Sequence, residues 1–216
     1  MLDLPRQRER LASGIEASLG PFDPLQLEAI RVVPRERFVR PRDVAQSAED
    51  MPLPLDEHGL ATVSAPHAYL LSFRLLALAP GDALVELGSG TGYGAALASF
   101  IVGPRGHVLT IEIDHALASR AHALLADLPN VTAEQGDAVA STARWGAATK
   151  VVCTFAVSEL PHAWLDALPD RGILVAPVGS RDGQELVRVQ RSGEALNVTH
   201  HGGVRYVANR SSATAT

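Results

Sequence analysis

The stretch VELGSGTGY, residues 85–93, decides how this chain folds. It starts with apolar residues typical of a buried strand, carries an acid at Glu86, and runs into a glycine-dense turn before a helical pattern begins. Glycine has no side chain and tolerates positive φ angles, so a turn of this kind lets the backbone come very close to a small molecule. The residues around the glycines indicate which molecule that is.

The spacing of the glycines favours a methyl donor over a dinucleotide. The dinucleotide pattern G-x-G-x-x-G fits Gly88 and Gly90, but its third position falls on Tyr93. The Glu86 carboxylate would repel a pyrophosphate, whereas it suits the sulfonium and ammonium groups of S-adenosylmethionine. No Gly-Lys-Ser/Thr follows the glycines, so a P-loop is a poorer match. The alternative is a plain structural turn.

Two more acids follow the next strands of the pattern. The apolar run 108–111 ends at Glu112, where an acid can bind both ribose hydroxyls of a nucleoside. Asp137 follows the third strand and can accept a hydrogen bond from an adenine amine. Either acid alone could be an ordinary surface carboxylate. Placed at the ends of successive parallel strands, they predict a nucleoside-like ligand beside the glycine turn.

The composition is that of one globular domain. The chain has 216 residues, 46% of them hydrophobic, and a net charge of −5, which argues against a general nucleic-acid binder. Residues 1–10 lack the apolar core of a signal peptide, and no run reaches the ~18 apolar residues of a membrane span, so we expect a cytoplasmic protein. The one cysteine, Cys153, follows two valines and is expected to be a core residue.

Helical and strand patterns alternate, which predicts an α/β fold with a mostly parallel sheet and helices on both faces. Helices are expected at residues 2–19, 25–33, 67–78, 92–102, 117–128 and 163–168. Strands are expected at 83–87, 108–111, 131–133, 151–154 and 173–177, followed by an antiparallel pair at 185–190 and 204–207. The proline-broken stretch 41–66 is expected to be mostly irregular and functional or mobile.

We therefore expect three parts along the chain. Residues 1–80 would form an N-terminal helical extension and a substrate loop, packed on the same domain. Residues 81–208 would form the cofactor-binding core, and residues 209–216 a frayed tail.

Seven short motifs give the chain a resemblance to a known family. They are VPRERFV at 33–39, PLP at 52–54, TVSAPH at 62–67, GD at 136–137, ELP at 159–161, APVG at 176–179 and GVRYV at 203–207. With the glycine turn, these motifs resemble the protein-L-isoaspartate O-methyltransferases, which are class I S-adenosylmethionine-dependent enzymes with a Rossmann-like fold. The resemblance runs from about residue 33 to residue 207, and TVSAPH is its most specific part.

The resemblance implies a role for individual residues. Ser64 would lie beside the transferred methyl group and the substrate carboxylate as the catalytic residue, although it could instead cap the following helix. The substrate would contact Thr62, Val63, His67 and Phe155. The cofactor would be bound by Glu86, Gly88, Ser89, Gly90, Thr91, Gly92, Glu112, Ile113, Gly136, Asp137, Ala138 and Thr154.

The chain departs from the family mainly on the substrate side. The usual Gly-x-Gly-Gln run before the Thr-x-Ser is replaced by the longer, more acidic stretch 55–61, which has no glutamine. A bulky Phe155 stands in a segment that is usually small and alanine-rich, and Ala138 replaces the glycine of Gly-Asp-Gly. The cofactor motifs are retained, so the departures bear on which substrate is methylated.

The resulting functional hypothesis is carboxyl O-methylation. A substrate carboxylate is already ionised at pH 7 and can attack a sulfonium methyl group without a dedicated base. We expect a monomer that uses S-adenosylmethionine and acts on isoaspartyl or aspartyl side chains of a protein or peptide, with no nucleic-acid or membrane partner. The alternatives are a tailoring methyltransferase for a particular modified peptide or small molecule, and an inactive S-adenosylmethionine-binding regulatory module.

Two histidines and a run of arginines are further candidate site residues. His115 and His122 lie two turns apart on a predicted helix, but no cysteine or carboxylate set joins them at ligand spacing, so no metal site is expected. Arg35, Arg37, Arg40 and Arg42 form a basic run. This run is interpreted either as a solvated face or as a patch that attracts an acidic peptide.

Overall fold

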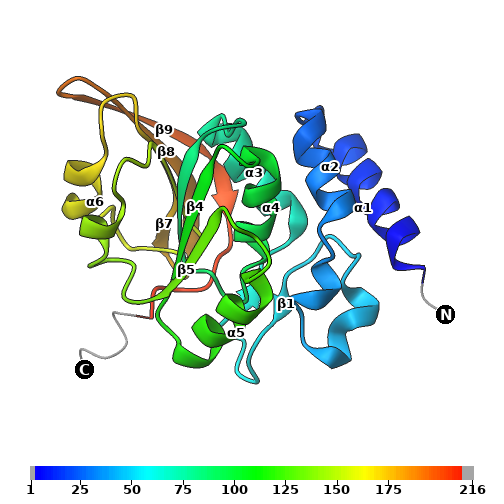
Figure 1. Cartoon of the computed structure of the whole chain (residues 1–216). Coiled ribbons are helices and arrows are strands. Elements are labelled where there is room, and N and C mark those ends of the chain that lie inside the picture. Colours follow the sequence, from blue (N-terminus) through cyan, green and yellow to red (C-terminus); the bar gives the residue numbers. More distant parts are fainter. Residues whose placement is uncertain (1–2, 211–216) are drawn as a thin grey trace.

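A seven-stranded sheet forms the centre of the molecule, in the order β5-β4-β3-β6-β7-β8-β9 (Figure 1). The structure is a computed structural model that describes residues 3–210. Its strands are β3 (Ala83–Leu87), β4 (His107–Glu112), β5 (Val131–Gln135), β6 (Lys150–Cys153), β7 (Ile173–Ser180), β8 (Gly183–Ser192) and β9 (Ala195–Val204). The first five run parallel, and β8 and β9 are antiparallel to their neighbours. The predicted fold class is confirmed.

Helices cover both faces of this sheet, as predicted. They are α1 (Leu4–Leu19), α2 (Pro24–Val32), α3 (Pro66–Leu76), α4 (Tyr93–Val102), α5 (His115–Leu125) and α6 (His162–Ala167). Helices α1 to α5 share one hydrophobic cluster with one face, while α6 and the short 3₁₀ helix η3 (Thr142–Arg144) lie over the other (Figure 1). Within residues 3–210, no helix is both long and apolar enough to cross a bilayer.

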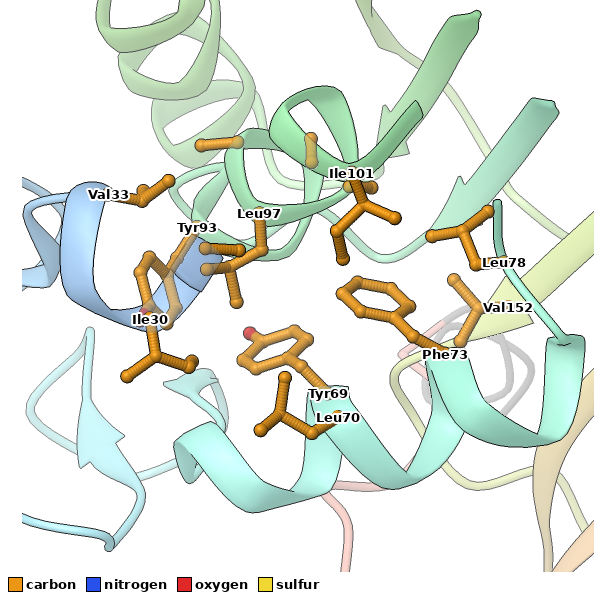
Figure 2. Close-up of a cluster of buried hydrophobic side chains, with 14 of the residues drawn as sticks. Ile30, Val33, Tyr69, Leu70, Phe73, Leu78, Tyr93, Leu97, Ile101 and Val152 are labelled. Atoms are coloured by element: carbon orange, nitrogen blue, oxygen red, sulfur yellow. The ribbon is translucent and has the colours of Figure 1, made fainter. Parts of the chain in front are cut away.

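The packing between α2, α3 and α4 anchors the segment that carries Ser64. Figure 2 shows Tyr69 and Phe73 of α3 pointing toward Leu97 and Ile101 of α4. The rings of Tyr69 and Tyr93 meet edge to face with their centroids 5.6 Å apart. Each such buried side chain stabilises the fold by roughly 1.5–3 kcal/mol. The start of α3, directly after Ser64, is therefore held firmly against the helix that follows the glycine turn.

The segment between α2 and α3 is mostly irregular, as predicted. It contains the 3₁₀ helices η1 (Arg35–Arg37) and η2 (Pro41–Gln46) and the two-residue strands β1 (Leu53–Pro54) and β2 (Thr62–Val63). β1 and β2 pair antiparallel through Leu53–Val63 and Pro54–Thr62. Such a short pair is not stable by itself. Other contacts must hold this segment, and they are described below.

The last strand lies earlier in the chain than predicted. β9 spans residues 195–204 rather than 204–207. It is an edge strand whose residues are mostly exposed and polar, so it lacks the alternating apolar pattern on which the prediction relied. Residues 205–207 instead run toward the end of β6, where the Ala156 N–H donates to the Val207 carbonyl at 2.8 Å.

The chain remains attached to the fold just beyond this point. The Asn209 N–H donates to the Ala156 carbonyl at 3.0 Å, and Arg210 forms an ion pair with Asp114 at 3.2 Å. The rest of the tail predicted to fray, residues 211–216, lies outside the described residues.

Candidate cofactor and substrate site

The glycine turn follows β3 at the point where the chain order in the sheet reverses. β3 pairs with β4 on one side and with β6 on the other, so a crevice opens beyond their carboxyl ends. Gly88 has a φ of 95°, and a Cβ there would stand 2.6 Å from Thr154 Oγ1 and 2.8 Å from Phe155. Only glycine fits both this backbone conformation and this space. The turn is thus pressed against the residues that follow β6.

A cavity lies in this crevice and brings together most of the predicted cofactor residues. It contains about 530 Å³ of space, part of it open to solvent, which is within the usual size of a small-molecule site. Of the predicted cofactor residues, the cavity wall includes Gly88, Gly90, Glu112, Ile113, Asp137, Ala138 and Thr154. These residues come from the ends of successive strands, which is why a pattern of strand ends could find them.

Glu112 closes the glycine turn as well as lining the cavity. Its carboxylate accepts hydrogen bonds from the Gly90 N–H at 2.7 Å and the Asp114 N–H at 3.0 Å. Burial raises its pKa, and the two N–H donors oppose that shift. A carboxylate oxygen has more than one lone pair, so Glu112 keeps acceptor capacity toward the cavity.

Glu86 does not line the cavity. Its side chain is 1% exposed and accepts a hydrogen bond from Thr110 Oγ1 at 2.6 Å. Burial and, to a smaller extent, the nearby Glu112 carboxylate raise the pKa of Glu86 to about 8, although the hydrogen bond from Thr110 opposes this shift. Glu86 is therefore largely protonated at neutral pH. Its role in this structure is to fill the space under α4, which differs from the charged partner for a cationic ligand that we expected.

Four further predicted cofactor residues also lie outside the cavity wall. Ser89 Oγ pairs with Thr110 Oγ1 at 2.5 Å, and Thr91 Oγ1 donates to the Phe38 carbonyl at 2.6 Å. Gly92 has a φ of 94° and leaves no room for a Cβ beside Leu125. These residues shape the turn and tie it to neighbouring segments. Gly136 likewise is not part of the wall.

Phe155 lies on the cofactor side of the site. It lines the same cavity as Thr154 and packs edge-on against Trp164, with ring centroids 6.3 Å apart. The sequence prediction placed Phe155 at the substrate. Its ring is instead part of the wall next to Gly88.

A second, wider groove runs beside the cavity and carries the predicted catalytic residue. Its lining includes Ser64, His67 and Thr62, together with Arg205 and Tyr206 from the chain after β9. Thr62 lines both the groove and the cofactor cavity, so the two spaces adjoin at this residue. Val63, also predicted at the substrate, is 2% exposed and belongs to the core.

The start of α3 is organised by Asp50 rather than by Ser64. The Asp50 carboxylate accepts the His67 N–H and approaches His67 Nδ1, both at 3.0 Å. Burial would raise the pKa of Asp50, but the hydrogen bonds with His67 outweigh it and the pKa is lowered. The residue at the helix cap is Ala65, with no side-chain cap. Ser64 is therefore not the cap of α3, which was the alternative interpretation.

The basic run does not form one solvated patch. Arg35 is 1% exposed and binds main-chain carbonyls, and Arg40 bonds the Asp43 carboxylate and the Asp56 carbonyl at 2.6 and 2.8 Å. Only Arg37 and Arg42 are exposed.

Sequence reasoning missed two segments of the cavity wall. One is the loop at Leu60 and Ala61, and the other is the stretch 207–210. The motif GVRYV ends at Val207 and was the available signal for the second segment. The loop carries no such signal, because it is the part that departs from the family pattern.

Fold and site together define a Rossmann-like, S-adenosylmethionine-dependent methyltransferase of class I. Its components are the parallel sheet, the glycine turn against the end of β6, and Glu112 at the end of β4. The tight glycine cradle leaves space for a nucleoside but provides no cationic group for a pyrophosphate on the turn itself.

Comparisons with known proteins identify the family within this class. The profile of the protein-L-isoaspartate(D-aspartate) O-methyltransferase (PCMT) family matches residues 23–213. The chain is 36% identical over 213 residues to protein-L-isoaspartate O-methyltransferase 2 of Archaeoglobus fulgidus, covering 97% of this chain and 95% of that one. It is 36% identical over 183 residues to the Methanothermobacter thermautotrophicus enzyme, covering 83% of each chain.

Solved structures agree on the fold. A protein-L-isoaspartate O-methyltransferase superposes with a TM-score of 0.84 at 23% identity, covering 93% of this chain and 65% of that longer one. A Plasmodium falciparum structure described as a putative member, in complex with S-adenosyl-L-homocysteine, gives a TM-score of 0.77 at 18% identity, covering 97% and 99%. The chain belongs to the protein-L-isoaspartate O-methyltransferase family.

Proposed function

We propose that this protein methylates the carboxylate of isoaspartyl residues in proteins or peptides, with S-adenosylmethionine as the methyl donor. The observation that carries the proposal is the adjacency of two spaces. The cofactor cavity and the groove holding Ser64 and His67 share Thr62 as a common wall residue. A donor in the cavity and a carboxylate in the groove would meet there.

The cavity residues suit the nucleoside part of this donor. Glu112 would accept from ribose hydroxyls, and Asp137 from the adenine amine. Gly88 and Gly90 would let the backbone approach closely, and Phe155 would supply an apolar wall. When bound, S-adenosylmethionine supplies an electrophilic methyl group.

The groove residues would position the substrate. Ser64 would donate one hydrogen bond to orient the carboxylate, and no residue needs to remove a proton because the carboxylate is already ionised at pH 7. Arg205 lines the same groove, is exposed, and would attract the negative charge. Such positioning can supply several kcal/mol of the barrier reduction, on the order of 7 for well-oriented reactants.

The direct test compares an isoaspartyl peptide with its normal aspartyl twin. We expect methyl transfer to the isoaspartyl peptide alone. Ser64→Ala should lower kcat on that peptide while leaving the affinity for S-adenosylhomocysteine unchanged, because Ser64 lies in the groove and not in the cofactor wall. If Ser64→Ala keeps full activity, the role assigned to Ser64 fails. If the wild type methylates neither peptide, the repair function itself fails.

A second candidate is a tailoring enzyme that methylates an aspartate of one particular peptide. The observation that favours it is the altered stretch 55–61, which borders the cofactor cavity at Leu60 and Ala61. The same peptide pair distinguishes the two functions, since a tailoring enzyme would ignore a random isoaspartyl peptide. The third possibility, a regulatory module, requires cofactor binding without transfer to any peptide.

We further propose a monomer that acts in the cytoplasm without nucleic acid. The net charge of −5 supports the last point, because a nucleic-acid binder usually presents a basic surface. Light scattering in solution would test the monomer, a mobility-shift assay would test binding to nucleic acid, and cell fractionation would test the location.

A further inference from the structure

Arg35 is a buried arginine whose guanidinium group donates its hydrogen bonds to main-chain carbonyl groups. Arg35 is the first residue of η1 and is 1% exposed. Nη1 and Nη2 donate to five carbonyl oxygens at 2.7 to 3.4 Å, those of Ser47, Glu49, Met51, Val63 and Ser64, and Nη2 shares its two hydrogens among three of them. Burial lowers the pKa of Arg35, but an arginine stays charged in proteins. A buried charge persists only when it is well hydrogen-bonded, so these carbonyls must stay in place around it.

The bonds of Arg35 join two irregular segments that are also linked by the contacts of Asp50 with His67. One segment is 47–51, and the other is 63–64 at the end of β2. The pairing of β1 with β2 fixes only two residues of each strand. Arg35 therefore adds a second polar connection, beside that of Asp50 with His67, between the chain that precedes β1 and the main chain at Ser64.

Arg35 also connects Ser64 to the cofactor turn. The guanidinium carbon lies 5.8 Å from the ring centroid of Tyr93, the first residue of α4. Tyr69 of α3 packs edge-on against the same ring. Arg35 thus bonds the Ser64 carbonyl, and both Arg35 and Tyr69 contact Tyr93 at the start of the helix that follows Gly92.

We propose that Arg35 is a positioning residue for methyl transfer. It holds the Ser64 main chain at a fixed place relative to the glycine turn, so that the Ser64 hydroxyl can orient the substrate carboxylate beside the methyl donor. This inference rests on the function proposed above. Arg35 belongs to the basic run of the sequence, and this internal positioning role differs from both the solvated face and the peptide-attracting patch that were expected for that run.

The test uses Arg35→Lys, with Arg37→Lys as its matched control. Lysine keeps the charge but presents a compact ammonium in place of the planar guanidinium, so it cannot reach the same five carbonyls. Arg37 lies in the same 3₁₀ helix, is exposed, and undergoes the identical substitution. For each full-length variant we would measure kcat and KM on the isoaspartyl peptide and the dissociation constant of S-adenosylhomocysteine.

We expect Arg35→Lys to lower kcat by at least ~10-fold, because a misplacement of about 1 Å can cost up to ~100-fold in rate. The dissociation constant of the cofactor product should change less than about twofold, since Arg35 is absent from the cavity wall. Arg37→Lys should change neither quantity. An unchanged kcat in Arg35→Lys would overturn the proposal. So would a parallel loss of cofactor affinity, which would mean that Arg35 merely supports the fold.

A double-mutant cycle asks whether Arg35 acts through Ser64. In the Ser64→Ala background, Arg35→Lys should lower kcat by less than about threefold, because residues that act as a unit are not additive. Fully additive losses would contradict the proposal even if both single variants were impaired. The result of this cycle is distinct from a failure of the proposed isoaspartyl methylation, because in that case the wild type would methylate neither peptide.

Discussion

Gly94, the second residue of α4, gives a prediction that runs against the usual rule for helices. Replacing a helical glycine by alanine normally stabilises a protein by about 0.5–1 kcal/mol. At Gly94, however, a Cβ would stand 1.9 Å from Glu86 Oε1 and 2.6 Å from Tyr69 Cε1. The first distance is roughly 1.5 Å short of an ordinary contact, and the carboxyl of Glu86 is buried and has no route to solvent.

We therefore expect Gly94→Ala to destabilise the protein. Overpacking of a buried site costs about 1–3 kcal/mol, which exceeds the gain in helix propensity. For a domain of this size the melting temperature should fall by roughly 2–4 °C for each kcal/mol lost. The shift of Glu86 would also disturb the hydrogen bond from Thr110, so the affinity for S-adenosylhomocysteine should weaken.

Gly14 in α1 is the matched control. It is exposed, and a Cβ there would meet nothing within 4 Å. Gly14→Ala should raise the melting temperature by roughly 1–4 °C, the value expected from propensity alone. The melting temperatures of both variants and the wild type can be measured by circular dichroism. If Gly94→Ala is stabilised as much as Gly14→Ala, the close packing of Glu86 under α4 is refuted.

Three further changes test other parts of the site. The pKa of Glu86 is raised from its ordinary 4.5 to about 8, so the wild type loses stability as the pH rises between these values, where only the unfolded chain ionises. Relative to the wild type, Glu86→Gln should therefore gain stability from pH 5 to pH 8, by a few kcal/mol at most. A pH-independent difference between the two proteins in denaturant titrations would contradict this. Thr91→Val removes the 2.6 Å bond to the Phe38 carbonyl and should lower the free energy of unfolding by about 1–3 kcal/mol in a urea titration, whereas an unchanged midpoint would exclude a structural role for that bond. Phe155→Ala should weaken S-adenosylhomocysteine binding several-fold in calorimetry with little change in peptide KM, and an effect confined to peptide KM would return Phe155 to the substrate side.

Strand order made the cofactor cavity predictable from the sequence. Glu112 ends a parallel strand and Gly88 and Asp137 follow two others, and parallel register brings such positions to one edge of the sheet. The helices and the parallel strands were likewise predictable, because spaced apolar residues or short continuous apolar runs mark them in the sequence. The edge strand β9 has no such period, since both its faces are largely exposed.

The protonation of Glu86 and the burial of Arg35 could not be read from the sequence. Both depend on which side of an element a charged group faces and on what covers it. Glu86 turns toward α4 instead of the cavity, and its burial changes its charge. Arg35 is surrounded by carbonyls from segments 12 to 29 residues away, a distance over which no local pattern operates.

The central claim is that this protein transfers a methyl group from S-adenosylmethionine to the carboxylate of an isoaspartyl residue. The most direct measurement is transfer of a labelled methyl group to an isoaspartyl peptide, with its aspartyl twin in parallel, followed by brief treatment with base. A methyl ester releases labelled methanol in base, whereas an N-methyl group does not. We predict base-labile label on the isoaspartyl peptide alone. Base-stable label, or equal label on both peptides, would contradict the account.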